Sequence, residues 1–203
     1  RTDAFVAGLD EPGFAHRFLG SRLGATTHIS VVDGEGRACS VTCTNGEGSG
    51  VVVPGTGIHL NNIMGEEDLN PLGFHVFAPG RRMPSMMAPT VVLRDGEVEL
   101  VVGSAGSNRI RSAILLTIVG VVDRGLDARA AVEAPRIHYE DGTVYVEPGI
   151  DADALAAAGH EVAPFRAPNL FFGGVQAVQR DPATGAVLGA GDPRRGGAAV
   201  AVP

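Results

Sequence analysis

The chain has 203 residues, of which 44% are hydrophobic, and it carries a formal net charge of −7. Its length is enough to bury one core and its composition excludes wholesale disorder, so we expect a folded domain. All 16 basic residues are arginine, which excludes any mechanism that uses a lysine of this chain, such as Schiff-base catalysis. The acidic balance also argues against a nucleic-acid partner, because phosphate binding needs clustered positive charge.

No apolar run approaches the ~20 residues that a membrane-spanning helix needs. The longest, residues 113–122, is interrupted by Thr117 and Gly120 and is typical of a core helix. The N-terminus shows no signal-peptide pattern. Cys39 and Cys43 lie in one predicted strand, where about 13 Å of extended chain separates them, too far for a disulfide bond. We therefore expect two buried thiols.

The first half of the chain predicts one helix, one hairpin and a long loop. Residues 10–23 have helical spacing. A hairpin is expected next, formed by residues 27–33 and 37–45 around a glycine-containing turn. Residues 65–82 show no periodicity and predict an irregular loop, and loops of that length are often functional.

The second half alternates further hairpins with helices. The strand pairs are expected at residues 89–93 with 98–102, 136–139 with 143–146, and 175–180 with 186–190. Helical spacing predicts an apolar helix over residues 110–122 and two short helices that begin at the capping residues Asp127 and Asp151. Paired strands with helices between them indicate an α+β domain with a largely antiparallel sheet.

The common catalytic patterns are absent. Ser104 lacks the glycine spacing of a GxSxG nucleophile elbow, and no GxGxxG occurs. The six histidines are scattered, with no HExxH or CxxC, so no metal site is expected. Glu66 and Glu67 could work as an acid and a base, but a pair of adjacent carboxylates is more typical of a solvated loop.

Six short motifs occur in a fixed order. They are residues 26–33 (Thr-Thr-His-Ile-Ser-Val-Val-Asp), 42–45 (Thr-Cys-Thr-Asn), 57–62 (Gly-Ile-His-Leu-Asn-Asn), 85–90 (Ser-Met-Met-Ala-Pro-Thr), 103–107 (Gly-Ser-Ala-Gly-Ser) and 191–194 (Gly-Asp-Pro-Arg). The ordered set resembles the small subunit of the γ-glutamyltransferases, a family of N-terminal-nucleophile hydrolases. The resemblance implies a four-layer αββα sandwich with largely antiparallel sheets. It also implies that residues 1–25 end the large subunit and that residues 26–203 form the catalytic small subunit.

The resemblance implies a specific chemistry. A precursor would cleave itself between Ala25 and Thr26, and the Thr26 hydroxyl would then act as the nucleophile. The freed α-amino group, with an ordinary pKa of about 7.7–8.0, would take the hydroxyl proton, so neither a histidine nor a cofactor is implied. By the same resemblance, Thr44 would orient the Thr26 hydroxyl, and the backbone N–H groups of Gly106 and Ser107 would bind the oxyanion.

The same resemblance implies the substrate-binding residues. Asn45 and Ser85 would hold the carboxylate end of the acyl group, and Glu66 would contact the donor's α-amino group. Three departures from the family pattern bear on the substrate. Ile63 stands where the family commonly has Gln or Glu, Met86 replaces the second of two serines, and Ser107 replaces the second glycine of the oxyanion pair. A pocket that loses polar partners should bind a zwitterionic head group less well.

Three functions stay open on this reasoning. The first is a self-processing γ-glutamyltransferase-like enzyme that transfers the acyl group of donors such as glutathione to water or an amine. The second is a cephalosporin or glutaryl-type acylase, or another amide hydrolase of the same superfamily, which the polarity lost at Ile63 and Met86 favours. The third is an unprocessed, non-catalytic homologue, and the presence of residues 1–25 before Thr26 supports it.

The first two functions imply two partners. One is the chain's own large subunit from the same precursor, in a heterodimer or a higher oligomer, and the other is a small amide or peptide donor. Neither nucleic acid nor a membrane span is expected. The absence of lysine beside abundant arginine suggests a bacterial source. The compartment stays open between cytoplasm, periplasm and secretion, because any signal would lie in the large subunit.

Overall fold

A computed structural model describes residues 26–202 of the chain. The helix predicted over residues 10–23 lies outside this range, as does Ala25. The described residues begin with the predicted hairpin, formed by β1 (Thr26–Val32) and β2 (Ala38–Thr44). The two strands pair in antiparallel register, so that Thr26 lies opposite Thr44 at the open end. Asp33 fixes the turn, because its carboxylate accepts the backbone N–H of Arg37 at 2.9 Å.

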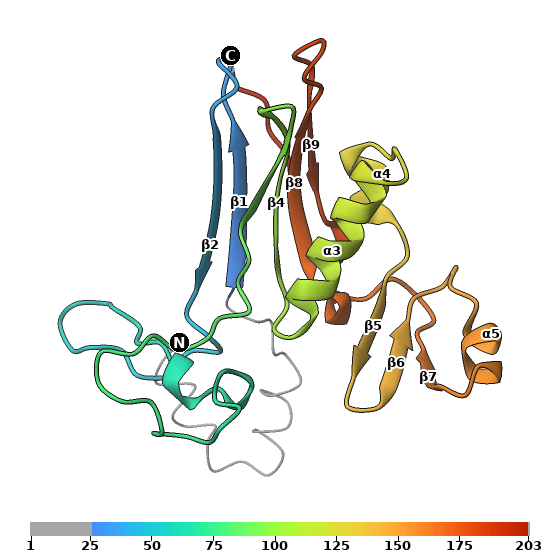
Figure 1. The fold of residues 1–203 in the computed structure, drawn as a ribbon. Coiled ribbons are helices and arrows are strands. Elements are labelled where there is room, and N and C mark those ends of the chain that lie inside the picture. Colours follow the sequence, from blue (N-terminus) through green and yellow to red (C-terminus); the bar gives the residue numbers. More distant parts are fainter. Residues whose placement is uncertain (1–25, 203) are drawn as a thin grey trace.

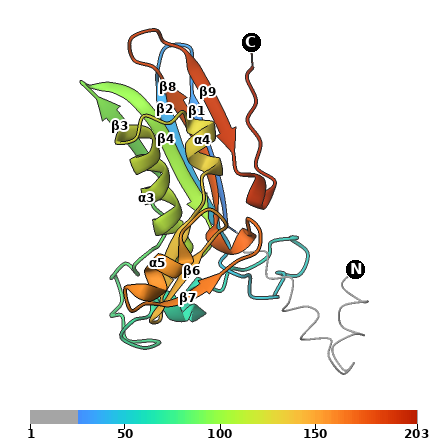
Figure 2. The ribbon, with the colours of Figure 1, turned by 90° about the vertical axis from the view of Figure 1, so that its right-hand side faces the viewer.

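The core of the molecule is a four-stranded antiparallel sheet with helices on one face. Its strands, in spatial order, are β3 (Thr90–Arg94), β4 (Glu97–Ala105), β8 (Gly174–Arg180) and β9 (Val187–Gly191). The β1–β2 hairpin stacks on one face of this sheet, and α3 (Arg109–Val122) and α4 (Ala128–Glu133) cover the other (Figures 1 and 2). Leu100, Val102 and Val175 point from the sheet into the helices and are fully buried.

The predicted α+β class is therefore present, and the described residues supply three layers: hairpin, sheet and helices. The second helical layer of the expected αββα sandwich is not among residues 26–202. The three predicted strand pairs of the second half are present, and Asp127 and Asp151 begin helices as expected. Each of these two carboxylates accepts a backbone N–H of the first helical turn, at 2.7 and 2.9 Å.

Polar side chains fill the space between the hairpin and the sheet. The Ser30 hydroxyl donates to the Gln176 carbonyl at 3.0 Å, and the Ser40 hydroxyl donates to the Val102 carbonyl at 3.2 Å. His28 lies between them against Gly103, where a Cβ would collide with the imidazole ring. Burial lowers the pKa of His28 to about 4, so its ring is neutral at pH 7. These bonds fix the height of β1 on the sheet and with it the position of Thr26.

A smaller sheet extends beside the end of α3 that carries Arg109 (Figure 1). It contains β5 (Ile137–Glu140), β6 (Thr143–Val146) and β7 (Glu161–Pro164), with α5 (Ala152–Ala157) leading into β7. The β5–β6 hairpin was predicted, whereas β7 was not. β7 pairs in parallel with β6, so it lacks the hairpin turn that marks the other strands in the sequence.

Two further expectations differ from the structure. Cys39 and Cys43 are free thiols as expected, but both are exposed, so the prediction of buried thiols is wrong. The cause is strand alternation, because Ser40 and Thr42 take the inward positions of β2. The second difference is that β4 continues three residues beyond the predicted end, as far as Ala105. Within residues 26–202, no helix has the length and apolar character to cross a bilayer.

Candidate active site

Two threonine hydroxyls meet at the open end of the first hairpin. Thr26 begins β1 and Thr44 ends β2, and their Oγ1 atoms are 2.8 Å apart. The Gly46 backbone N–H donates to Thr44 Oγ1 at 3.0 Å, which leaves the Thr44 proton available for the Thr26 oxygen. Thr27 is exposed on the opposite face of β1, as its place one residue along the strand predicts.

These hydroxyls open into a cavity of about 690 Å³. The cavity lies between the end of the hairpin and the loop that joins β2 to β3, with the start of α3 at its edge. Five of the site residues named from the sequence lie in its wall. They are Thr26, Thr44, Glu66, Ser85 and Ser107.

The remaining two predicted site residues, Asn45 and Gly106, do not line the cavity. The Asn45 side chain is turned to its own loop, where its amide donates to the His59 carbonyl at 3.3 Å. Gly106 lies directly beside Ser107 and packs against Gly173. A Cβ on Gly106 would lie 2.6 Å from the Gly173 Cα, and its φ of +133° is one that glycine favours, so no other residue fits there without strain.

One wall of the cavity is acidic. It contains Glu47, Glu66, Glu67 and Asp68. Burial is the main cause that raises the pKa of Glu66, and the neighbouring charges of Glu47 and Asp68 raise it further. An ammonium group placed there would offset the repulsion between these carboxylates, so this wall suits a cationic head group.

Another part of the wall is apolar. Ile63, Met83, Met86 and Met87 line the cavity together with Leu69. Ile63 and Met86 are the departures from the family pattern that remove a polar side chain, and the structure places both in the wall. The cavity therefore combines a negatively charged side with a flexible hydrophobic one, which suits an acyl chain of several methylene groups.

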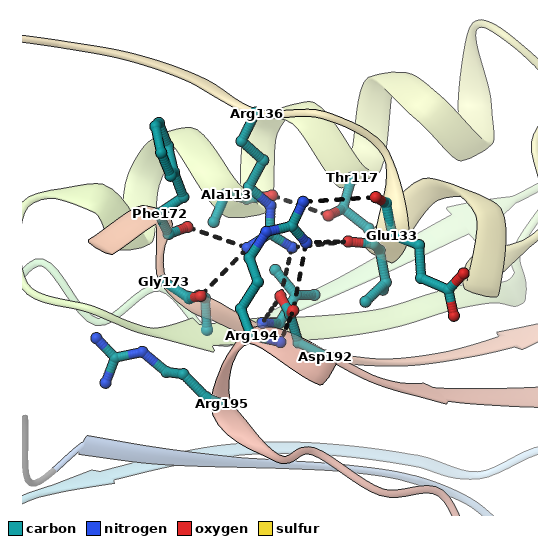
Figure 3. A network of polar contacts seen from close by, with 12 residues as sticks. Ala113, Thr117, Glu133, Arg136, Phe172, Gly173, Asp192, Arg194 and Arg195 are labelled. Atoms are coloured by element: carbon teal, nitrogen blue, oxygen red, sulfur yellow. Dashed lines mark hydrogen bonds and ion pairs between the residues drawn. The ribbon is translucent and has the colours of Figure 1, made fainter. Parts of the chain in front are cut away.

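A buried ion-pair network behind Gly106 was not anticipated from the sequence (Figure 3). Arg136 pairs with Asp192 at 2.6 Å, and the two side chains are 3% and 0% exposed. The Arg136 guanidinium also donates to the carbonyls of Phe172 and Gly173, at 3.0 and 3.3 Å. These bonds hold in place the backbone on which Gly106 packs.

A second buried pair continues this network. Arg194 contacts Glu147 at 2.5 Å, and Arg194 also donates to the Val132 and Ala134 carbonyls at 2.9 Å each. The only sequence signal for it is the Gly-Asp-Pro-Arg motif of residues 191–194, which by itself points to no role. The network joins the C-terminal segment to α4 and to the end of β6, so it fixes three distant parts of the chain to one another.

The layering and the site define a class of protein. A threonine hydroxyl at the start of the first strand, held by a neighbouring hydroxyl between two stacked sheets, is the arrangement of an N-terminal-nucleophile hydrolase fold. Residues 15–202 match the family model described as gamma-glutamyltranspeptidase. The chain belongs to this family, which confirms the family and the α+β class predicted from the sequence.

Relatives in the family carry two kinds of name. The chain is 35% identical over 182 residues to the glutathione hydrolase proenzyme of Bacillus subtilis (strain 168), a match that covers 88% of this chain and 31% of that protein. It is 37% identical over 188 residues to the acylase ACY 1 proenzyme of Pseudomonas sp. (strain SE83), which covers 90% of this chain and 33% of that protein. The chain thus spans about a third of the length of these curated relatives.

A solved structure matches over its whole chain. The gamma-glutamyltranspeptidase from Pseudomonas nitroreducens complexed with L-DON aligns with a TM-score of 0.73 and 34% sequence identity. The alignment covers 87% of this chain and 100% of the matched one. The fold of residues 26–202 is therefore that of a complete polypeptide chain in that structure.

Proposed function

We propose that this chain carries the nucleophile of a self-processing amide hydrolase or acyltransferase and that Thr26 is the nucleophile. The observation that carries the proposal is the 2.8 Å contact between the Thr26 and Thr44 hydroxyls in the wall of a cavity. A hydroxyl is a weak nucleophile unless a base and an orienting group act on it. Thr44 is the orienting group, and the α-amino group that cleavage of the bond to Ala25 frees is the base.

The proposed reaction has two halves. In the first, the Thr26 α-amino group takes the hydroxyl proton while Oγ1 attacks the donor's amide carbon. The negative oxygen of the tetrahedral intermediate accepts hydrogen bonds from the N–H groups of Gly106 and Ser107, and the leaving amine takes the proton as the C–N bond breaks. In the second half, water or an acceptor amine attacks the carbonyl carbon of the ester and passes a proton to the Thr26 α-amino group. The bond between that carbon and Oγ1 then breaks, Oγ1 takes the proton, and the acyl group leaves as an acid or an amide.

The cavity wall supports a carboxy-acyl donor. Ser85 and Glu66 line the same cavity as Thr26, so a γ-glutamyl group on Thr26 could place its carboxylate at Ser85 and its ammonium at Glu66. The name glutathione hydrolase of the Bacillus subtilis relative is in line with such a donor. Asn45 is a further proposed contact of the carboxylate. Its side-chain amide donates to the His59 carbonyl here, so the side chain would have to rotate to reach the donor.

A second candidate function is a glutaryl-type acylase. The specific observation in its favour is that Ile63 and Met86 stand in the cavity wall, where they offer no polar partner to an ammonium or a carboxylate. The similarity to an acylase proenzyme of Pseudomonas is in line with this alternative. A glutaryl group keeps the carboxylate of a glutamyl group but lacks its ammonium, so it needs fewer polar partners.

We infer that the working protein contains the rest of the precursor as a partner. The chain covers about a third of its curated relatives, whose names call them proenzymes. The Pseudomonas nitroreducens structure contains a separate chain that this one covers in full, which supports a cut that leaves residues 26–203 as a chain of its own. Such a partner would complete the cavity and supply further contacts to the donor.

The test of the nucleophile uses the full-length precursor. Its intact mass after expression should show two chains, the smaller beginning at Thr26. A Thr26→Ala variant should stay uncut and should not turn over γ-glutamyl anilide, whereas Thr27→Ala, the control on the opposite strand face, should be cut and active. A Thr26→Ala precursor that is still cut there would show that Thr26 is not the nucleophile, and an uncut, inactive wild type would favour a non-catalytic homologue.

The test of the donor compares two substrates on the same processed protein. If Glu66 binds an ammonium, kcat/KM should be higher for the γ-glutamyl anilide than for the glutaryl anilide. A clear preference for the glutaryl compound would instead support the acylase function. Either result leaves the assignment of Thr26 intact, because both donors pass through the same ester.

A further inference from the structure

One carboxylate from another element binds the two residues at the start of α3. Asn108 stands immediately before the helix, but its side chain makes no hydrogen bond to the helix's own N–H groups, as an asparagine at this position usually does. Instead its amide donates to Glu140 Oε1 at 2.5 Å. Arg109 Nη1 donates to the other oxygen of the same carboxylate at 3.3 Å. Glu140, the last residue of β5, thus binds both residues that follow Ser107.

Other contacts fix the orientation of Arg109 as well. Its Nε donates to the Phe171 carbonyl at 3.2 Å, and its guanidinium carbon lies 4.6 Å from the centre of the Phe171 ring. The side chains of Arg109 and Glu140 are 22% and 21% exposed, so water screens this pair less than a surface pair. A partly buried guanidinium with contacts on several sides has little freedom to turn.

The loop before the helix is anchored on its opposite side too. The Ser107 hydroxyl donates to Asp68 Oδ2 at 3.2 Å, and Gly106 packs against Gly173. Ser107 has a φ of +54°, which is unfavourable for a residue with a Cβ and must be held by its surroundings. No group in the described part of the chain accepts the Ser107 backbone N–H, which leaves this donor free for a ligand at the cavity.

We propose that Glu140 is a positioning residue for the reaction, because by binding Asn108 and Arg109 it holds the N–H groups of Gly106 and Ser107 where the oxyanion forms. The inference rests on the proposed function and adds to it a residue from the smaller sheet. Glu140 does not line the cavity, so it acts through the loop and not on the substrate. Its carboxylate works as one support, with Asp68 as the other.

The expected effect follows from when the oxyanion exists. Charge develops on that oxygen only in the transition state, so misplaced donors should lower kcat and leave KM nearly unchanged. Loss of an oxyanion donor typically costs a factor of about 100 to 1000, and a displaced donor should cost less. We therefore expect Glu140→Ala to lower kcat about tenfold.

The test uses the processed two-chain protein with γ-glutamyl or glutaryl anilide, whichever the wild type turns over. Glu140→Gln keeps an oxygen for the Asn108 amide and should stay within about threefold of the wild type. Glu97→Ala is the matched control, because Glu97 also pairs with an arginine, Arg180, at 3.3 Å, but at the end of β4 opposite to Ala105. It should leave kcat unchanged.

A double-mutant cycle separates positioning from general destabilisation. If Glu140 acts through Asn108, the Asn108→Ala and Glu140→Ala variants should each lower kcat, and the double variant should lose clearly less than the product of the two single losses. Should Glu140→Ala fail to mature, Asn108→Ala carries the test alone, by the same split between kcat and KM.

Two results would overturn the inference while the wild type is active: an unchanged kcat in the Glu140 and Asn108 variants, or an equal loss in Glu97→Ala. A wild type that turns over neither anilide would refute the proposed function itself, and the inference with it. The two failures are therefore told apart by the wild type alone.

Discussion

At the scale of single residues, the site depends on where strand alternation leaves each side chain. Thr26 and Thr44 face each other because they are cross-strand partners on the inward face, and a hairpin predicted from the sequence already implies that pairing. Glu66 differs, because it lies in a loop and strand alternation does not determine where its side chain points. Its place in the cavity wall and the cause of its raised pKa become visible only in the folded chain.

The raised pKa of Glu66 predicts how donor choice changes with pH. Because burial and the charges of Glu47 and Asp68 raise this pKa above its ordinary 4.5, the carboxylate becomes protonated at a higher pH than a free Glu. As the pH falls from 7.5 towards 5, the ratio of kcat/KM for γ-glutamyl over glutaryl anilide should therefore fall. Protonation of the Thr26 amine affects both donors alike and cancels in this ratio.

Two variants test whether Glu66 is the residue that binds the donor's ammonium group. Glu66→Gln should make the ratio low and independent of pH. Glu67→Gln removes a neighbouring carboxylate from the same wall and should keep the wild-type dependence. A Glu66→Gln ratio equal to that of the wild type at pH 7.5 would show that Glu66 does not bind the ammonium.

The residues that could be found from the sequence share one property. Thr26, Thr44, Ser85 and Ser107 each lie in a short local motif, and each lines the cavity. Asn45 lies in such a motif too, but glycines follow it and leave the loop free to turn the side chain towards His59. Glu140 could not be found in this way, because it is 32 residues from Asn108 and the contact depends on how β5 packs beside α3.

At the scale of elements, two salt bridges of the same length show what burial changes. Arg136 and Asp192 are 2.6 Å apart and almost fully buried, whereas Arg37 and Asp33 are 2.6 Å apart beside an exposed turn. The buried pair joins the segment before β5 to the segment after β9. Removing one partner there leaves an uncompensated buried charge, which typically costs about 3–5 kcal/mol.

We therefore expect Asp192→Asn to lower the midpoint of thermal unfolding by several degrees in the processed protein, and Asp33→Asn to leave it unchanged. Asp192→Asn should also lower kcat, since the network holds Gly173, on which Gly106 packs. Differential scanning calorimetry of the two variants under one buffer checks the first statement. Equal shifts in both would mean that burial does not decide the strength of these pairs.

The strands themselves were largely predictable, because hairpins combine alternation with a turn of glycine or aspartate. The sequence did not predict β7, because this strand follows α5 and pairs in parallel with β6, so no hairpin turn precedes it. The exposure of Cys39 and Cys43 was missed for another reason. In the strand Ala-Cys-Ser-Val-Thr-Cys-Thr, the hydroxyl residues alternate with the cysteines and the valine. Here the hydroxyl residues face the sheet, so the cysteines face outwards.

At the scale of the whole molecule, the outer face of the first hairpin is apolar, and nothing within residues 26–202 covers it. Ile29, Val31 and Val41 are 55%, 48% and 40% exposed, and the two cysteines lie on the same face. On the inner face, the hydroxyls of Ser30 and Ser40 donate to backbone carbonyls of the sheet, so this part of the contact is polar. A two-stranded sheet in this condition is marginal in water without a partner.

The inferred large subunit predicts a protected face in the assembled protein. Residues 26–203 produced alone should aggregate or bind a hydrophobic dye, and their two thiols should react at once with a maleimide. In the processed two-chain protein the same thiols should react at least about tenfold more slowly, because local opening must precede the reaction. Peptide mass spectrometry locates the label on Cys39 and Cys43.

A cysteine placed on the β8–β9 turn gives the control for this measurement. Ala183 is exposed on that turn, which is not part of the hairpin's outer face, so an Ala183→Cys variant should be labelled quickly whether or not the partner is present. If Cys39 and Cys43 react as fast as this control in the processed protein, the outer face of the hairpin does not bind the large subunit. Slow labelling that becomes fast when the two chains are separated by mild denaturant would instead tie the protection to that contact.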